Sequence, residues 1–391
     1  MKLFYSLAPD FDFIDQPILI DSTYTTGLLN KSSGDVLLLN SELTALLSLF
    51  RHPATVADAA HTFAEQLNAP SADIQVVIQA SVDTFVQQGI LITSERLHQK
   101  LAYPFPRLQP RAAIKSYVIV KELSVSPPVG TYLVRTQTGE KCVLKKLFIH
   151  PDEHPADVRA QKKEFAYEFQ ILGHLAGCPL IRELIEFDAS ENIGVTDYFT
   201  GVSLRKFIIG CHETLSIARR ISLFSQLIEG MDGLHSRQVL HGDLHYSNVL
   251  INKKTQLRLI DFDLSFFWKD RTKKGLKYGG IIDFIPPERL TDDVFHQSSG
   301  APNFRAEVYQ IGVLGYFIFH GKLPFEGQTW RDQVAAIRCA PPVWESPAPL
   351  FIRNLIEKAL NKKPAQRFPS ATAMKAIVTE NRDNQITISL H

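Results

Sequence analysis

The chain has 391 residues, of which 45% are hydrophobic, and its 42 basic residues nearly balance its 41 acidic residues, for a formal net charge of +1. A chain of this size can bury more than one core, and its small net charge gives no electrostatic reason to expect binding to nucleic acid or to a membrane surface. The four cysteines stand singly, without the spacing of a zinc site or a disulfide framework.

The beginning of the chain, MKLFYSLAPDFDFIDQ, lacks the basic start and the continuous apolar core of a secretory signal. Scattered single cysteines are typical of reducing compartments. These two features predict a cytoplasmic protein.

Residues 1–96 are expected to form a unit of their own. Residues 17–21 and 35–39 have strand character, and the Thr-, Gly- and Ser-rich stretch between them would be a connection. Three helical periods follow, at residues 40–50, 55–67 and 71–88, and residues 90–92 return as a strand. Strands, three helices and a closing strand predict a winged-helix-like module. The following segment, 97–111, contains three prolines and is expected to be a linker.

A second unit begins near residue 112. An apolar strand at 141–147 contains Lys145, and a helical period includes Glu168. Residues 193–199 have the pattern of a strand that enters a linker, and a helix is expected from Ser203. In isolation, Lys145 and Glu168 would be interpreted as solvated charges on a strand and a helix.

The most informative segment is residues 241–263, HGDLHYSNVLINKKTQLRLIDFD. Its apolar runs at 249–251 and 257–260 flank a turn and predict a hairpin, which would bring Asp243, Asn248 and Asp261 to one end of a small sheet. Phosphoryl transfer needs a base for the acceptor hydroxyl and oxygen ligands for Mg²⁺, and this segment supplies both. The alternative is that these aspartates are ordinary turn residues.

The segment resembles the protein kinase motifs H-R-D-L-x-x-x-N and D-F-G, with Gly242 in place of Arg and Asp263 in place of Gly. The resemblance runs from about residue 112 to 378 and implies an α+β, bilobal fold that uses ATP and Mg²⁺. Residues 112–200 would form the N-lobe and hinge, 201–378 the C-lobe, and 379–391 a C-terminal tail.

The same resemblance assigns roles to individual residues. Asp243 would be the base, Lys145 would hold the phosphates while it pairs with Glu168, and Asn248 and Asp261 would bind the metal. His245 would lie near the transferred phosphate or merely line the loop.

The resemblance also assigns contacts with the nucleotide. The backbones of Asp197 and Phe199 would bind adenine, with Thr196 behind them. Gly130 would be the last glycine of a degenerate phosphate loop at 123–130. Two prolines, Pro127 and Pro128, remove N–H groups from that loop.

Further downstream, Glu288 is expected to pair with Arg367, and Glu307 to anchor the catalytic loop from a buried central helix. The strings HGDLH and IDFD also resemble aminoglycoside and choline phosphotransferases. The Glu288, central-helix and Arg367 motifs favour a peptide or protein acceptor instead. A pseudokinase scaffold and a signalling Ser/Thr kinase with a regulatory winged helix stay open as alternatives.

Residues 1–96 resemble the PqqD-like elements that recognise precursors of ribosomally synthesised, modified peptides (RiPP). The resemblance implies that a leader peptide adds as a strand beside residues 35–39, with the helix 71–88 completing the groove. That helix contains two Asp and no Lys or Arg, which disfavours DNA binding. The expected function is therefore phosphorylation of Ser or Thr in a captured precursor peptide, as in lanthipeptide biosynthesis. Nothing in the 391 residues is left over for a lyase or cyclase domain, so either partner enzymes of those kinds complete the route or phosphate is the final modification.

Overall fold

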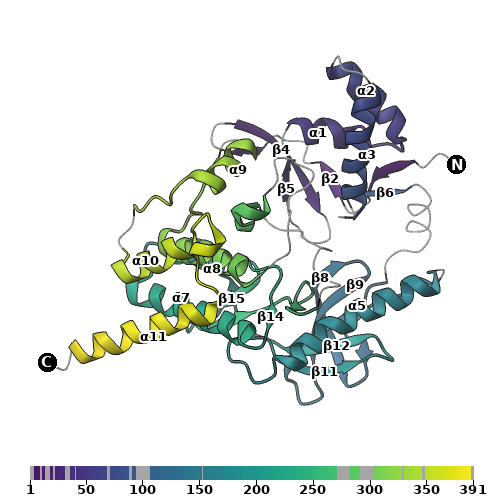
Figure 1. Cartoon of the computed structure of the whole chain (residues 1–391). Helices are drawn as coiled ribbons and strands as arrows, with labels where there is room; N and C mark the ends of the chain where they lie inside the picture. Colours follow the sequence, from purple (N-terminus) through teal and green to yellow (C-terminus); the bar gives the residue numbers. More distant parts are fainter. Residues whose placement is uncertain are drawn as a thin grey trace.

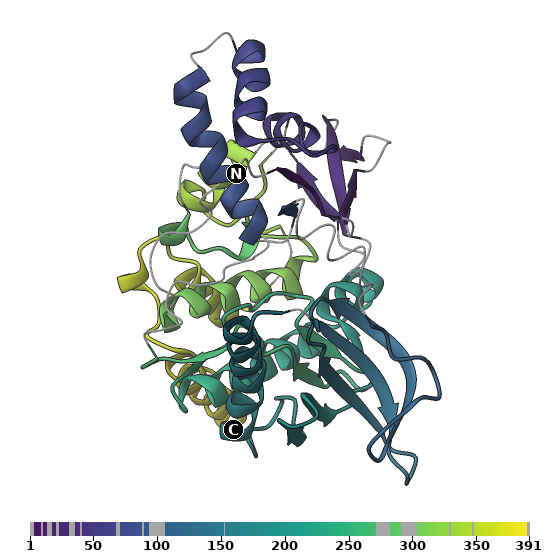
Figure 2. The same ribbon diagram turned by 90° about the vertical axis from the view of Figure 1, so that its right-hand side faces the viewer.

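The computed structural model describes residues 4–8, 11–13, 18–20, 23–30, 36–39, 41–67, 71–87, 90–93, 106–151, 153–270, 282–290, 303–327, 330–345 and 348–388. Most of the predicted linker, 97–111, lies outside these ranges. Figures 1 and 2 show an N-terminal unit beside a larger body, on the side of that body that carries helix α9 (Trp330–Cys339).

The three predicted helices of the N-terminal unit are present as α1 (Ser41–Ser48), α2 (Val56–Leu67) and α3 (Ser71–Gln87). The predicted closing strand is β6 (Leu91–Thr93), which pairs antiparallel with β1 (Tyr5–Leu7). The apolar faces of these elements form a core of their own, which includes Leu28, Leu47, Phe50, Val82 and Leu91. The unit therefore has the separate hydrophobic core expected of a domain.

The strand prediction for this unit was incomplete. Strands β3 (Ile18–Ile20) and β5 (Val36–Leu39) lie where strands were expected, but the predicted connection between them is largely an eight-residue strand, β4 (Thr23–Asn30). Strand β4 pairs with β3, with β5 and with β2 (Phe11–Phe13). Its Thr and Tyr residues have high strand propensity, and pairing with several neighbours outweighs the single glycine within it.

The next lobe is a six-stranded antiparallel sheet with one long helix, α5 (Pro155–His174). In spatial order its strands are β11 (Leu184–Asp188), β12 (Ile193–Asp197), β10 (Lys141–Leu147), β9 (Val129–Arg135), β8 (Tyr117–Ser126) and β7 (Ala113–Ile114). One face of the sheet carries a core of apolar side chains that includes Tyr132, Val134, Leu144 and Val195. The strand predicted to contain Lys145 has the bounds that the sequence indicated.

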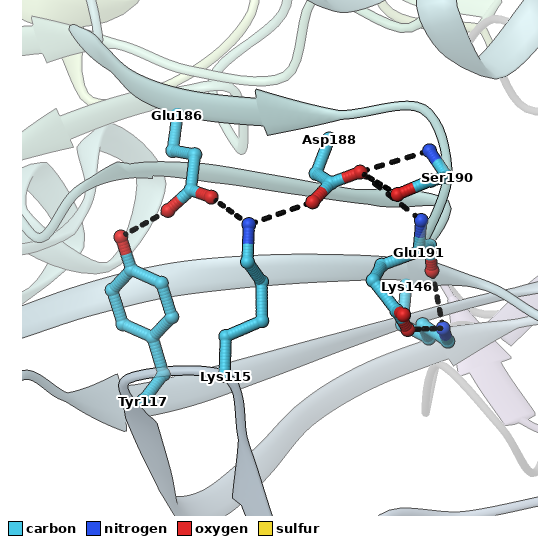
Figure 3. A network of polar contacts seen from close by, with 7 residues as sticks. All are labelled: Lys115, Tyr117, Lys146, Glu186, Asp188, Ser190 and Glu191. Atoms are coloured by element: carbon cyan, nitrogen blue, oxygen red, sulfur yellow. Dashed lines mark hydrogen bonds and ion pairs between the residues drawn. The ribbon is translucent and has the colours of Figure 1, made fainter.

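A polar network joins the two edges of this sheet (Figure 3). Lys115, at the β7–β8 turn, pairs with Glu186 and with Asp188, whose Oδ2 lies 2.6 Å from its Nζ. The Tyr117 hydroxyl donates to Glu186 at 2.9 Å. Because β7 and β11 are opposite edges of the sheet, these contacts require the sheet to curl, and they link its first and last strands.

The second lobe is mainly helical. Its helices are α6 (Leu204–Cys211), α7 (Ile217–His235), α8 (Phe304–His320), α9, α10 (Leu350–Ala359) and α11 (Ala371–Ile388). Two small sheets complete it, β13 (Val202–Ser203) with β15 (Val249–Ile251) and β16 (Leu257–Leu259), and β14 (Val239–Leu240) with β17 (Phe266–Phe267). Short 3₁₀ turns occur at Ile282–Phe284, Pro287–Arg289 and Pro364–Gln366. Helix α11 extends through most of the segment predicted to be a tail.

Helix α8 is the centre of the second lobe and is almost completely buried. It begins where the Asn303 side chain accepts a hydrogen bond from the Ala306 N–H at 3.0 Å, and it ends at Gly321, whose φ is +72°. The predicted pair of Arg367 and Glu288 is present as two parallel hydrogen bonds of 2.8 and 2.7 Å. In the part of the chain that the structure describes, no helix is long and apolar enough to cross a bilayer.

Candidate active site

The hairpin predicted within residues 241–263 is present and aligns the candidate catalytic residues. Strands β15 and β16 pair antiparallel, and Asn252 closes their turn by accepting hydrogen bonds from the N–H groups of Lys254 and Gln256 at 2.9 and 3.0 Å. At the other end, the Ile260 N–H donates to the Asn248 carbonyl oxygen at 3.0 Å. This register brings Asn248 next to Asp261, thirteen positions along the chain.

Asp243 lies beside Asn248 and His245. The Asn248 Nδ2 donates to the Asp243 carbonyl oxygen at 2.9 Å and to its Oδ2 at 3.2 Å. His245 accepts the Ser247 N–H at its Nδ1, and its Nε2 lies 3.3 Å from Asp243 Oδ2 and 3.2 Å from Asn248 Nδ2. Asn248 and His245 thus orient the Asp243 carboxylate. The Asp243 side chain is 22% exposed, so a hydroxyl group that accepts phosphate can reach it.

Lys145 bridges the two lobes. Its Nζ lies 2.7 Å from Glu168 Oε1, on α5, and 3.1 Å from Asp261 Oδ1, after β16. Glu168 is buried, whereas the side chain of Asp261 is 42% exposed. The positive charge of Lys145 holds the pKa of Asp261 below its usual range, so Asp261 is ionised and available to a cation. The structure therefore brings together three residues that the sequence separates widely.

Asp263, which replaces the glycine of D-F-G, adds a further carboxylate to this region. Its side chain is exposed, but protein atoms displace part of its hydration, and together with the charge of Asp261 this raises its pKa to about 7. Two aspartates two positions apart thus have opposite pKa shifts, because Asp261 contacts Lys145 and Asp263 has no such ion pair among the described residues.

Gly242 has a geometric reason to replace arginine. Its φ is +83°, and a Cβ at this position would lie 2.1 Å from the Leu264 carbonyl oxygen. The Gly242 N–H donates to Glu307 Oε1 at 2.8 Å, which confirms that α8 anchors the catalytic loop. A side chain at this position would therefore push the loop away from its anchor.

His235 completes the anchor and was not predicted. It accepts the Ala371 N–H at Nδ1 at 2.9 Å, so its Nε2 carries the proton and donates to Glu307 Oε2 at 2.9 Å. Glu307 and His235 are both buried. A single histidine at the end of an amphipathic helix gives no local sequence signal for this contact.

The hinge connects β12 to β13. The Asp197 N–H donates to the Glu183 carbonyl oxygen at 3.0 Å, so the Asp197 N–H is not available to adenine. In return, Asp197 Oδ1 accepts the Glu183 N–H at 2.7 Å. The N–H of Phe199 has no acceptor among the described residues. Gly201 lets the linker pass close to β15, because a Cβ there would lie 2.8 Å from the Ile251 carbonyl oxygen. The backbone contacts with adenine stay a prediction.

The predicted phosphate loop is a tight hairpin. Strand β8 ends at Ser126, β9 begins at Val129, and Pro127 and Pro128 form the turn, which offers no N–H. Lys145 pairs directly with Thr131, while Gly130 and Tyr132 pair with its neighbours in β10 and so belong to the opposite face of the sheet. A Cβ at Gly130 would lie 2.6 Å from the Tyr132 hydroxyl oxygen. Gly130 thus has a packing role, and its nucleotide-binding role stays a prediction.

Lys145, Glu168, Asp243, Asn248 and Asp261 lie where the two lobes meet, and this place is called the cleft below. Its polar groups fit ATP and Mg²⁺. Because both hydrogen bonds of Asn248 to Asp243 use Nδ2, its Oδ1 remains available, and oxygen ligands of this kind together with the ionised Asp261 suit Mg²⁺. Lys145, fixed by Glu168, suits phosphate oxygens.

Comparisons with known proteins agree with this chemistry. The family model described as "Protein kinase domain" matches residues 130–378. The chain is 22% identical to Aurora kinase C of Mus musculus over 275 residues, which are 68% of this chain and 95% of that protein. It is 27% identical to serine/threonine-protein kinase pkn2 of Myxococcus xanthus over 254 residues, covering 61% of this chain and 29% of that protein. It is 25% identical to Aurora kinase A-A of Xenopus laevis over 261 residues, covering 64% of this chain and 60% of that protein.

Proposed function

Because this chain belongs to the protein kinase family, we propose that its Ser/Thr kinase activity is directed at a peptide that residues 1–96 capture. The observation that carries the kinase chemistry is the convergence of Lys145 on both Glu168 and Asp261. These contacts argue against a pseudokinase scaffold, in which no such arrangement would be needed.

The geometry supports a direct transfer to a hydroxyl group. Asp243, oriented by Asn248 and His245, would accept the proton of a Ser or Thr hydroxyl as that oxygen attacks the γ-phosphorus. Lys145 would hold the α- and β-phosphates, and Asn248 and Asp261 would hold Mg²⁺. When bound, Mg²⁺ neutralises charge on the phosphates.

The N-terminal unit supports peptide capture through a free strand edge. Among the described residues, β5 pairs with β4 alone, so its other edge has backbone groups that a peptide strand can use. Helix α3, which was expected to complete the groove, packs mainly on α2 and β6, whereas α1 packs on β4 and β5 and is thus the helix in contact with the edge strand. Val76 and Val77, 72% and 55% exposed on α3, form a separate apolar surface.

Capture would act by raising the local concentration of the acceptor. A leader segment bound to residues 1–96 would hold the core of a RiPP precursor near the cleft, which increases its apparent affinity without new contacts at the catalytic residues. Elimination of phosphate or ring formation, as in lanthipeptide biosynthesis, would then be the task of partner lyase or cyclase enzymes. The precursor, its leader and these partners are all parts of the proposal.

The test uses radiolabelled ATP and a candidate precursor peptide that contains a leader segment. Removal of residues 1–96 is expected to raise KM for the full-length precursor by about 10- to 100-fold, as expected when tethering is lost, without changing ATP affinity. Free leader peptide should inhibit the full-length enzyme and leave the shortened enzyme unaffected. Equal KM values with and without residues 1–96 would contradict capture by this unit.

A further inference from the structure

Arg182 places a second cation beside the nucleotide site. Its N–H donates to the Leu259 carbonyl oxygen at 3.2 Å, and Ile181 forms a parallel bridge with Leu259. Leu259 ends β16, two positions before Asp261. The backbone of Arg182 is therefore fixed against the strand end that carries the candidate metal ligand.

The guanidinium of Arg182 has no partner in the part of the chain that the structure describes. Its Nε is shielded from solvent and has no hydrogen-bond acceptor there, and the hydroxyl of Thr196, in β12, is similarly unpaired. Buried polar groups are normally paired, because leaving them unpaired costs free energy. Arg182 is thus expected to gain its partner when the cleft is occupied.

Other arginines with shielded guanidinium atoms have partners in the fold: the Nε of Arg258 also has no partner among the described residues, but its Nη1 donates to the Ile181 carbonyl oxygen at 2.7 Å. Arg220 donates to the carbonyl oxygens of Leu215, Ile318 and Phe319, and Arg367 forms two hydrogen bonds with Glu288. Their roles are structural, since every contact is to the fold itself. Arg182 differs because its surroundings are the acidic groups of the cleft.

The electrostatic surroundings of Arg182 agree with this placement. Burial lowers the pKa of Arg182, while the charges of Asp197, Asp261 and Glu168 act in the opposite direction. The charge of Arg182 in turn contributes to the low pKa of Asp261. The influence is reciprocal, as expected for charges that share one region of low polarity.

The cleft needs positive charge. Four carboxylates belong to it, those of Glu168, Asp243, Asp261 and Asp263, and among the described Lys and Arg residues Lys145 alone forms an ion pair with any of them. A triphosphate adds more negative charge, and the turn at Pro127 and Pro128 has no N–H with which to offset it. Without a bound metal, one lysine would therefore face an excess of negative charge.

We propose that Arg182 is a positioning residue of the nucleotide site, whose guanidinium supplies the second positive charge that permits a triphosphate to bind among these carboxylates. The positive charge of Arg182 makes the electrostatic potential in the cleft more favourable for phosphates and stabilises the ionised side chains around it. Arg182 does not touch the reacting atoms. The inference rests on the nucleotide site assigned above.

The test measures nucleotide binding to the full-length protein by calorimetry, with EDTA present so that no metal contributes. Arg182→Met should raise the Kd for ATP about tenfold, which corresponds to about 1.4 kcal/mol, and leave the Kd for adenosine within about a factor of two. Adenosine lacks the phosphates, so it reports whether the pocket is intact. Arg182→Lys, which keeps the charge, should recover most of the ATP affinity.

Lys146→Met is the matched control. Lys146 directly follows Lys145 in β10, so it points to the opposite side of the sheet, and its Nζ donates to the Glu191 carbonyl oxygen (Figure 3). Its loss removes one positive charge close to the cleft but outside it, and ATP affinity should not change.

Two results would overturn the inference. If Arg182→Met binds ATP as tightly as the wild-type protein, the second charge is not needed. If it loses ATP and adenosine affinity in parallel, Arg182 serves packing alone. Failure of the wild-type protein to bind either compound would instead overturn the nucleotide site itself, and with it the role of Arg182.

Discussion

The floor and the roof of the cleft differ in the number of polar groups that they could offer to a nucleotide. The floor, residues 241–263, contains Asp243, Asn248 and Asp261, and contacts from α7 and α8 hold it in place. The roof, the β8–β9 hairpin, ends in two prolines and has its one glycine, Gly130, under a tyrosine ring. The candidate catalytic residues thus lie in the floor, while the roof is a packed hairpin.

This difference indicates where the binding energy for ATP comes from. A loop rich in N–H groups is one way to bind phosphates, and fixed cations are another. In this protein the candidate cations and metal ligands lie in the floor and the adjoining strands, whereas the turn of the roof has no N–H groups. Substitutions in the floor should therefore change catalysis, and substitutions in the roof should change mainly stability.

The largest effect is expected from Asp243→Ala. Loss of the base should lower kcat by about 10²- to 10⁴-fold, the usual contribution of a positioned acid or base, while the Kd for ATP stays nearly constant. Single-turnover transfer from radiolabelled ATP and a separate binding titration measure the two quantities. Undiminished turnover would remove Asp243 from the mechanism.

Gly242→Ala should destabilise the floor. The new Cβ would overlap the Leu264 carbonyl oxygen and the residue would keep a φ of +83°, so the free energy of unfolding should fall by about 3 kcal/mol or more. Gly139→Ala is the matched control, because Gly139 has a φ of +86° with open space around it, and its cost should be near 1 kcal/mol, about that of the backbone alone. Chemical denaturation measures both, and equal losses would mean that the contact with Leu264 contributes nothing.

Gly130→Ala tests the roof. A Cβ at this position would overlap the Tyr132 ring, and we expect a loss of about 1–3 kcal/mol of stability, as in other overpacked sites, with little change in ATP affinity. Thermal unfolding and an ATP titration measure the two effects. The opposite result, unchanged stability and much weaker ATP binding, would place Gly130 in the nucleotide site as the sequence motif predicts.

The smallest effect should come from Asp263→Asn. The raised pKa of Asp263, about 7, means that the folded protein binds a proton more readily than the unfolded chain, so this group makes stability fall as pH rises from about 4 to 7. The introduced amide cannot titrate, so the variant does not lose stability in this way. The difference in stability between the variant and the wild-type protein should therefore favour the variant more at pH 8 than at pH 5. Melting temperatures in EDTA at both pH values give the comparison, and an identical difference at both would show that Asp263 does not titrate in this range.

The sequence predicted the chemistry of the floor because that chemistry is local. Asp243, Asn248 and Asp261 lie within one hairpin, whose apolar runs and turn follow short-range rules. The helices of the N-terminal unit were predicted for the same reason. Strand β4 was missed because its pairing with β2, β3 and β5 depends on neighbours that local propensity does not reveal.

The amino-acid sequence by itself determined which groups can perform phosphoryl transfer, since side-chain chemistry and spacing within a hairpin are properties of the chain. The tertiary structure alone decided that Lys145 contacts Asp261 across 116 positions, that His235 supports Glu307 and that Gly130 belongs to the face opposite Lys145. It also decided that the Nε of Arg182 is shielded without an acceptor among the residues that the structure describes. These arrangements arise from burial and long-range strand pairing, which act on the folded chain as a whole.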